Sequence, residues 1–263
     1  MPALPPLSFN AWLRWDRVEP LLDGIGGGGS LGDVLEIGAG QGGIGTRLAS
    51  RGRYVGVDLD ATSIARARER LARAGTDGRA LHGHYDEVLD PDARFDLVCA
   101  FEVLEHIEDD AAAVRAWRER LRPGGHLLLS VPADPSRYAE ADSMAGHFRR
   151  YDVAAMTALL RAEGYEDLRV EYYGAPLGYA LERARNLLAR RRGFTTALPS
   201  GAADPSDATP ETEAFDTRTR SSGRLFQPTD AMGPLTRLGT APFRAMRPQT
   251  RHGAGLIALA RRA

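Results

Sequence analysis

A stretch in the middle of the chain, ADSMAGHFRRYD at residues 141–152, concentrates side chains that could carry acid–base chemistry. They are Asp142, His147, Arg149, Arg150 and Tyr151. Because imidazole titrates near neutral pH, we predict that His147 is a general base or binds a substrate hydroxyl, with Asp142 orienting it. Tyr151 joins the same predicted catalytic group, and the two arginines are predicted to bind an acidic group of the substrate. Alternatively, Asp152 caps the next helix, and the tyrosine and the arginines only hold the loop in place.

A glycine-rich turn is the second candidate site. In DVLEIGAGQGGIG, residues 33–45, five glycines follow a strand-like run directly. Glycine costs conformational entropy, so such a cluster indicates close approach of the backbone to a ligand, although it could also be only a tight turn. The turn fits both G-x-G-x-x-G, from Gly38, and E-x-G-x-G-x-G, from Glu36. Asp58 follows the next predicted strand, where either pattern expects an acid for ribose hydroxyls.

The remaining histidines are secondary candidates. His106, in LEHIED, is a candidate substrate-binding residue, with packing beside the site as the alternative. His82 and His84 lie near the third predicted strand. Neither H-x-x-x-H nor C-x-x-C spacing occurs in the sequence, so no metal site is predicted.

Composition excludes several classes of function. The 263 residues are 43% hydrophobic and 26% charged, with a net charge of -1, which gives no argument for nucleic-acid binding. The sequence contains no lysine, which excludes Schiff-base chemistry and a lysine base. The single cysteine, Cys99, cannot form an internal disulfide, and residues 1–10 lack the pattern of a secretion signal. We therefore expect a cytoplasmic location.

Strand and helix patterns alternate along the chain. Strands are predicted at residues 33–39, 54–60, within 78–88, and at 95–101, 126–133, 166–174 and 253–262. Helices are predicted at residues 11–23 with an interruption at Pro20, and at 42–52, 61–75, 109–125, 152–164 and 177–192. This alternation predicts an α/β fold with a parallel, doubly wound sheet. In such a sheet the glycine turn, Asp58 and residues 141–152 all lie at the carboxyl edge of the strands, where ligands bind.

Four motifs in this order carry a family resemblance. VLEIGAGQGG, GVDLD, FDLVCAFEVLEHIEDD (95–110) and LRPGGHLLLSVP (121–132) together resemble the class I S-adenosylmethionine (SAM) dependent methyltransferases. The likeness is greatest to the subgroup that includes ubiquinone-biosynthesis O-methyltransferases, and it covers residues 12–174. It implies a Rossmann-like, mostly parallel, seven-stranded sheet with an antiparallel last strand, and SAM as cofactor.

The resemblance also implies roles for individual residues of this sequence. Glu36 to Gly42, including Gly38 and Gly40, would form the loop against the methionine part of SAM. Asp58 would accept both ribose hydroxyls. The other implied cofactor contacts are Leu59, Tyr85 and Asp86 at the adenine, Phe101 and Glu102 at the sulfonium, and Arg14 at the carboxylate. Arg14 has a solvated helix arginine as its alternative.

The resemblance also frames the domain organisation. We expect a SAM-binding core at 1–174, an insertion at 175–253 and the last core strand at 254–263. The insertion is predicted to hold a basic helix, a mobile linker rich in Pro, Ser and Thr, and a lid-like segment. The basic helix at 177–192 could contact an anionic membrane peripherally or pack on its own domain. The oligomeric state is left open.

The predicted function is transfer of a methyl group from SAM to a small-molecule acceptor, at a hydroxyl oxygen, by in-line displacement with His147 as base. Two alternatives stay open. An NAD-dependent oxidoreductase would fit G-x-G-x-x-G, but a Tyr-x-x-x-Lys pair is excluded without lysine. A non-catalytic SAM-binding partner subunit would keep the glycine turn and Asp58.

Overall fold

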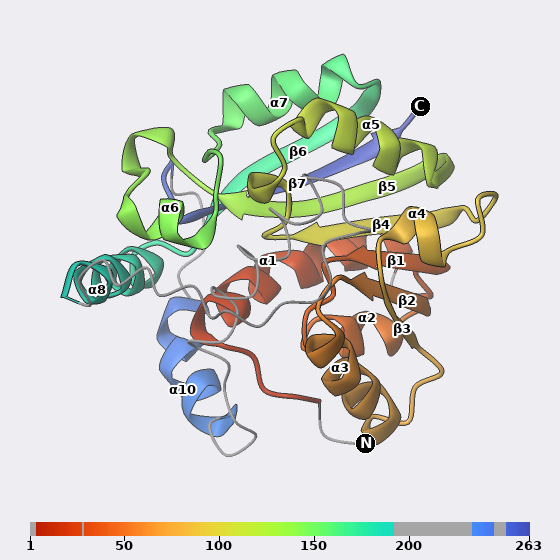
Figure 1. Cartoon of the computed structure of the whole chain (residues 1–263), viewed down its shortest axis with the longest axis horizontal. Helices are drawn as coiled ribbons and strands as arrows, with labels where there is room; N and C mark the ends of the chain where they lie inside the picture. The colour runs from red at the N-terminus through yellow and green to blue at the C-terminus, as the bar shows by residue number, and fades with distance from the viewer. Residues whose placement is uncertain (1–3, 28, 192–232, 245–250) are drawn as a thin grey trace, which may run out of the picture.

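The computed structural model describes residues 4–27, 29–191, 233–244 and 251–263 (Figure 1). Seven strands form one sheet in the order β3-β2-β1-β4-β5-β7-β6. The strands are β1 (Asp33–Ile37), β2 (Arg53–Asp58), β3 (Arg79–His82), β4 (Phe95–Phe101), β5 (Leu121–Pro132), β6 (Tyr165–Tyr173) and β7 (Gly255–Arg262). The first five are parallel, and β7 is antiparallel to both β5 and β6. The predicted fold is therefore confirmed.

Helices cover both faces of this sheet (Figure 1). They are α1 (Phe9–Gly26), α2 (Gly45–Ala49), α3 (Ala61–Arg73), α4 (Tyr85–Val88), α5 (Asp110–Glu119), α6 (Glu140–Ala145), α7 (Val153–Ala162), α8 (Leu177–Arg191) and α10 (Gly233–Arg244), with short 3-10 turns η1 (Leu104–His106) and η2 (Pro135–Arg137). Successive strand residues point to opposite faces, so Leu128 joins the core under α1 while Leu127 and Leu129 join the core under α5 and α7. All three leucines are fully buried, as strands covered on both faces require.

Three predicted elements differ from the structure. The helix predicted to reach residue 125 ends at Glu119, because Pro123 and the two glycines after it cannot continue a helix. Residues 121–125 instead begin β5, with a register irregularity opposite β4. Helix α1 runs through Pro20 rather than breaking there. Helix α6 lies inside the stretch that was predicted to be a loop.

The insertion contributes two described helices. Helix α8 lies beside α6, and α10 lies against α1 (Figure 1). Glu182 of α8 is buried, so this helix packs on its own domain at that position. The predicted mobile linker lies outside the described residues. No helix in the described ranges is long and apolar enough to cross a bilayer.

Candidate active site

The glycine turn and Asp58 form one unit at the carboxyl edge of β1 and β2. The turn is anchored by two N–H groups, of Gly38 and Ala39, which donate to the Val57 carbonyl at 2.9 and 3.0 Å. Asp58 Oδ2 accepts the Gly40 N–H at 2.7 Å, and its Oδ1 accepts the Asp60 N–H at 2.8 Å. Burial raises the pKa of Asp58 even though both backbone bonds favour its charged form. The carboxylate is thus held rigidly, and each oxygen keeps a lone pair for a further donor.

The surface above this turn has room for a ligand. Gly38 and Gly40 both have the left-handed backbone that favours glycine, with φ of 73° and 51°. A Cβ on Gly38 would lie 2.4 Å from Val103 Cγ2, so that position is closed by packing. A Cβ on Gly40 would meet nothing within 4 Å. The turn therefore fits a ligand that lies against bare backbone at Gly40.

The residues implied at the adenine gather at the ends of β2 and β3. Leu59 is partly exposed, and its carbonyl lies 3.0 Å from His82 Nε2. Tyr85 is buried, and the Arg120 guanidinium lies 5.7 Å from its ring centre. The Asp86 carboxylate pairs with Arg120 Nη2 at 2.7 Å. This ion pair holds the Asp86 side chain in place while leaving it half exposed.

A second anchor forms around Glu102, which follows β4. Its backbone is left-handed, with φ of 58°, an uncommon conformation for a non-glycine residue that is often found at functional sites. Glu102 Oε1 pairs with Arg14 Nη2 at 3.2 Å and accepts the Ser130 hydroxyl at 2.9 Å and the Tyr173 hydroxyl at 3.3 Å. Burial opposes its ionisation, but Arg14 and these hydrogen bonds outweigh burial and lower the pKa of Glu102.

The contacts around Glu102 show the surroundings of Arg14 and Phe101, two residues that were predicted to contact the cofactor. Arg14 is largely buried and also donates from Nε to the Tyr173 hydroxyl at 3.3 Å, so it is not a solvated arginine. Phe101 is buried in the core under α1. Sequence reasoning missed Ser130 and Tyr173, because only the pairing of β4 with β5 and the return of β6 bring them to Glu102.

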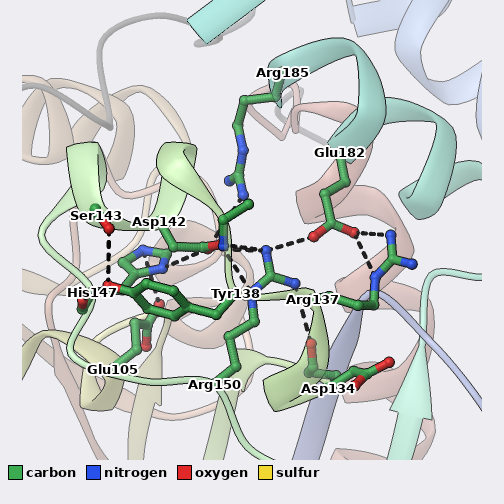
Figure 2. Close-up of polar contacts among 12 residues, drawn as sticks. Glu105, Asp134, Arg137, Tyr138, Asp142, Ser143, His147, Arg150, Glu182 and Arg185 are labelled. Carbon is green, nitrogen blue, oxygen red and sulfur yellow. Dashed lines mark hydrogen bonds and ion pairs between the residues drawn. The ribbon is translucent and has the colours of Figure 1, made fainter. Parts of the chain in front are cut away.

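His147 and Asp142 meet as predicted. His147 Nδ1 lies 3.0 Å from Asp142 Oδ1, and Nε2 lies 4.0 Å from Glu105 Oε1 (Figure 2). Burial raises the pKa of Asp142, but hydrogen bonds from His147 and Arg150 outweigh it and hold the pKa below its usual range. Because Asp142 is ionised, the proton between the two groups belongs to His147 Nδ1, and Nε2 is left as an acceptor in the neutral ring.

The His106 ring packs edge-on against His147, with ring centres 4.8 Å apart. Burial and the neighbouring His147 lower the pKa of His106 to about 4. Metal-binding atoms of Glu105, His106 and His147 all lie within 4.8 Å of one another. Glu105 is fully buried, and neither of its carboxylate oxygens is hydrogen-bonded to another described residue. Two imidazoles and a carboxylate are donors that suit Zn²⁺ and similar cations.

The other predicted residues of the 141–152 stretch have structural partners. Arg150 is buried, binds both oxygens of Asp142 and donates to the Ala133 carbonyl. Arg149 Nη1 pairs with Asp110 at 2.7 Å, and the Tyr151 hydroxyl donates to the same carboxylate at 2.8 Å. Through these contacts Arg149 and Tyr151 both bind Asp110 of α5 and not His147. The contacts of these three residues match the alternative in which they hold the loop in place.

A cavity of about 60 Å³ lies between α1, α8 and the adjoining ends of β6 and β7. Its lining includes Leu13, Glu102, Arg150, Tyr173, Glu182 and Arg185. The cavity thus extends from the Glu102 anchor toward the first helix of the insertion. It was not predictable from local sequence, because its walls come from segments more than a hundred residues apart.

Comparisons with known proteins agree with this geometry. A family described as "Methyltransferase domain" matches residues 35–127. A probable S-adenosylmethionine-dependent methyltransferase of Mycolicibacterium smegmatis is 37% identical over 55% of this chain and 57% of its own length. The ubiquinone biosynthesis O-methyltransferase of Alkalilimnicola ehrlichii is 33% identical over 48% of this chain and 50% of its own length.

The matched part of the chain thus spans about half the length of these curated relatives. Among solved structures, an S-adenosylmethionine dependent methyltransferase from Mesorhizobium loti shares the fold with a TM-score of 0.57. That likeness covers 97% of this chain and 100% of the other at 19% identity. Residues 35–127 of this chain therefore match the methyltransferase-domain family, and the whole chain shares its fold with an S-adenosylmethionine-dependent methyltransferase.

Proposed function

We propose that this protein transfers a methyl group from SAM to a hydroxyl oxygen of a small-molecule acceptor. The observation that carries the proposal is the Asp58 carboxylate, held by the Gly40 and Asp60 N–H groups beside a turn that is open at Gly40. An acid in this place accepts two ribose hydroxyls. The methyltransferase-domain match and the named function of the relatives support the same assignment.

The residues of the chain would share the binding of SAM as follows. Asp58 holds the ribose, and Leu59, Tyr85 and Asp86 surround the adenine. Arg14 and Glu102 hold the methionine end, where the ionised Glu102 places a negative charge near the cationic sulfur. SAM supplies a methyl group already activated on a sulfonium. The task of the protein is alignment, which contributes up to about 7–11 kcal/mol in well-oriented intramolecular systems.

The proton of the acceptor hydroxyl is assigned to His147. Asp142 keeps the Nδ1 proton in place, so the Nε2 lone pair is available to accept the hydroxyl proton as the oxygen attacks the methyl carbon. Such general-base assistance contributes roughly 10²- to 10⁴-fold in rate. A cation held by Glu105, His106 and His147 would occupy Nε2 and activate the hydroxyl instead. Turnover before and after EDTA treatment separates these two routes.

The proposal is tested by ligand-induced thermal shifts. We expect SAM and S-adenosylhomocysteine to raise the melting temperature and NAD to leave it unchanged. Asp58→Ala should abolish the shift, whereas Asp77→Ala, which removes an exposed acid after α3, should keep it. A shift with NAD alone would contradict the proposal and favour the oxidoreductase alternative.

Turnover then tests the base. Formation of S-adenosylhomocysteine with a panel of phenolic and aliphatic hydroxyl acceptors should identify an acceptor class. His147→Gln should keep the S-adenosylhomocysteine shift and lower turnover by about 10²-fold or more. Unchanged turnover in this variant would remove His147 from the role of base. Binding of SAM without turnover of any acceptor would favour the non-catalytic partner subunit.

A further inference from the structure

A buried ion-pair network connects the insertion to the loop that carries His147. Figure 2 shows Arg150 between Asp142 and Glu182. Arg150 Nη2 lies 2.7 Å from Asp142 Oδ2 and 2.5 Å from Glu182 Oε1, and all three side chains are at least 93% buried. Arg137 Nη2 donates to Glu182 Oε2 at 2.6 Å. Glu182 belongs to α8, so this helix is tied to the loop through charge.

The network ends on the imidazole of His147. Asp142 Oδ1 accepts the His147 Nδ1 proton at 3.0 Å, and the same oxygen lies 3.0 Å from Arg150 Nη2 and 3.5 Å from Arg185 Nη2. Asp142 is therefore shared between His147 and two guanidinium groups. The hold of Asp142 on His147 depends on how strongly those cations compete for it.

Glu182 moderates that competition. Among the five charged residues of the network, two carboxylates, Asp142 and Glu182, face three arginines, Arg137, Arg150 and Arg185. Without the Glu182 carboxylate, the buried Arg150 would have Asp142 as its only anionic partner in this group, and Arg185 also faces Asp142. Uncompensated charge is costly at the buried Arg150, whose side chain is 1% exposed, so Arg150 would draw Asp142 away from His147. The Nδ1 proton would then lose its acceptor.

We infer that Glu182 is a positioning residue for His147, acting through Arg150 and Asp142. Helix α8 of the insertion then helps to position a catalytic residue and does not only pack over the site. The groups that face His147 directly are Asp142 from its own loop and Glu105 and His106 from η1, and none of them reaches Glu182. The catalytic consequence of this inference rests on the proposed function, whereas the structural consequence does not.

The test uses Glu182→Gln in the full chain, because glutamine keeps the shape of the side chain and removes its charge. We expect the affinity for S-adenosylhomocysteine and the KM for SAM to stay within about twofold, because α8 lies outside the predicted cofactor contacts. Turnover should fall by about 10- to 100-fold, as for a misplaced catalytic group. Nitrogen-15 NMR of labelled histidine should show the His147 proton shifting from Nδ1 to Nε2, with assignment by His147→Gln.

Two further variants make the outcome decisive. Glu182→Asp keeps the charge and should restore most of the turnover and the Nδ1 tautomer, whereas a pure packing role would make it as damaging as Glu182→Gln. Glu163→Gln breaks another arginine–glutamate pair, with Arg115 at 2.7 Å, outside this network and should change neither readout. An unchanged tautomer in Glu182→Gln overturns the inference. If Glu182→Gln alters the tautomer of His147 but His147→Gln is still fully active, the inference about Glu182 holds. The assignment of His147 as the general base is then wrong.

Discussion

Two glutamates of the candidate site, Glu36 in β1 and Glu102 after β4, have pKa values that are shifted in opposite directions. Burial raises the pKa of Glu36 to about 8, with the Tyr54 hydroxyl donating to it at 2.5 Å as a weaker opposing effect. The Glu102 side chain is 34% exposed, and Arg14 holds its pKa below the usual range. Glu102 has a direct ion pair with Arg14 at 3.2 Å, whereas the hydrogen-bond partner of Glu36 is the hydroxyl of Tyr54. Near neutral pH the candidate site therefore holds a neutral carboxyl, Glu36, under the glycine turn and a negative one, Glu102, beside Arg14.

The raised pKa of Glu36 predicts a pH-dependent effect of Glu36→Gln on stability. An unfolded glutamate ionises at about pH 4.3, whereas Glu36 in the folded protein stays protonated up to about pH 8. Between these values folding must bind a proton, so this residue's contribution to stability is full below about pH 4 and falls as pH rises toward 8. Glu36→Gln removes this loss of up to ~1.4 kcal/mol per pH unit.

Thermal unfolding of the wild type and the variant from pH 5 to pH 8.5 measures this effect. The melting temperature of Glu36→Gln minus that of the wild type should increase steadily with pH and level off above pH 8. Glu69→Gln, at an exposed position on α3, should give a nearly constant difference. A flat difference for Glu36→Gln would show that this carboxyl ionises normally in the folded protein.

Residues in local motifs could be predicted, and residues that depend on tertiary contacts could not. The place of Asp58 beside the glycine turn was predictable, because its position after a strand and a glycine turn is a local pattern. Glu105 carries no local signal of its closeness to His147, since 42 positions of sequence separate them. For Arg149, Arg150 and Tyr151 the residue types suggested a role in catalysis or substrate binding. In the structure their side chains instead bind Asp110 and Asp142.

At the scale of elements, the turn from β1 to α2 predicts different outcomes for two glycine substitutions. Gly40→Ala should cost about 1–2 kcal/mol for its left-handed backbone and little more, because its Cβ meets nothing within 4 Å. Its methyl group would occupy the proposed ligand space, so the affinity for S-adenosylhomocysteine should fall at least tenfold. Calorimetric titration and urea unfolding measure the two effects separately.

Gly38→Ala is the matched comparison on the same turn. It carries the same backbone cost and adds a clash with Val103, so its loss of stability should exceed that of Gly40→Ala. Replacing Val103 by alanine in the Gly38→Ala background should recover part of the loss. If Gly40→Ala binds S-adenosylhomocysteine as tightly as the wild type does, the ligand does not lie over this turn.

Helices and strands were predicted correctly where a single hydrophobic pattern dominated the local sequence. The run FDLVCAF is apolar throughout and coincides with β4 at both ends. The start of β5 was missed because Pro and Gly at 123–125 mark a turn locally, yet Leu121 pairs with Phe95 before that turn and His126 with Leu97 after it. Helix α10 was missed because its Gly and Pro residues lower helix propensity, whereas contacts with α1 stabilise it.

At the scale of the whole molecule, the insertion separates β6 from β7 in sequence but not in the sheet. Strand β7 lies between β5 and β6 and buries every residue from Gly255 to Ala260. Ile257 of β7 and Leu128 of β5 are both fully buried in the core under α1. The sheet therefore cannot complete its core until the chain returns from the insertion. This predicts one cooperative unfolding unit that includes both sides of the insertion.

Core substitutions on the two sides of the insertion test this cooperativity. Ile257→Ala and Leu128→Ala should each cost about 2–5 kcal/mol, because each leaves a cavity in the same core. Leu235→Ala, at a 61% exposed position on α10, should change stability by less than about 0.5 kcal/mol. Urea unfolding followed by far-UV circular dichroism and by tryptophan fluorescence should give coincident transitions for all three variants.

The tryptophans make the test specific for each face of the sheet. Trp12 and Trp15 lie in α1 on one face, and Trp117 lies in α5 on the other. With Trp117→Phe, fluorescence reports only the α1 face, and its midpoint should still equal that of circular dichroism in the Ile257→Ala background. An earlier fluorescence midpoint would mean that α1, which supplies Arg14, can separate from an otherwise folded sheet. Cofactor binding and global stability would then be independent, and the single-unit prediction would be wrong.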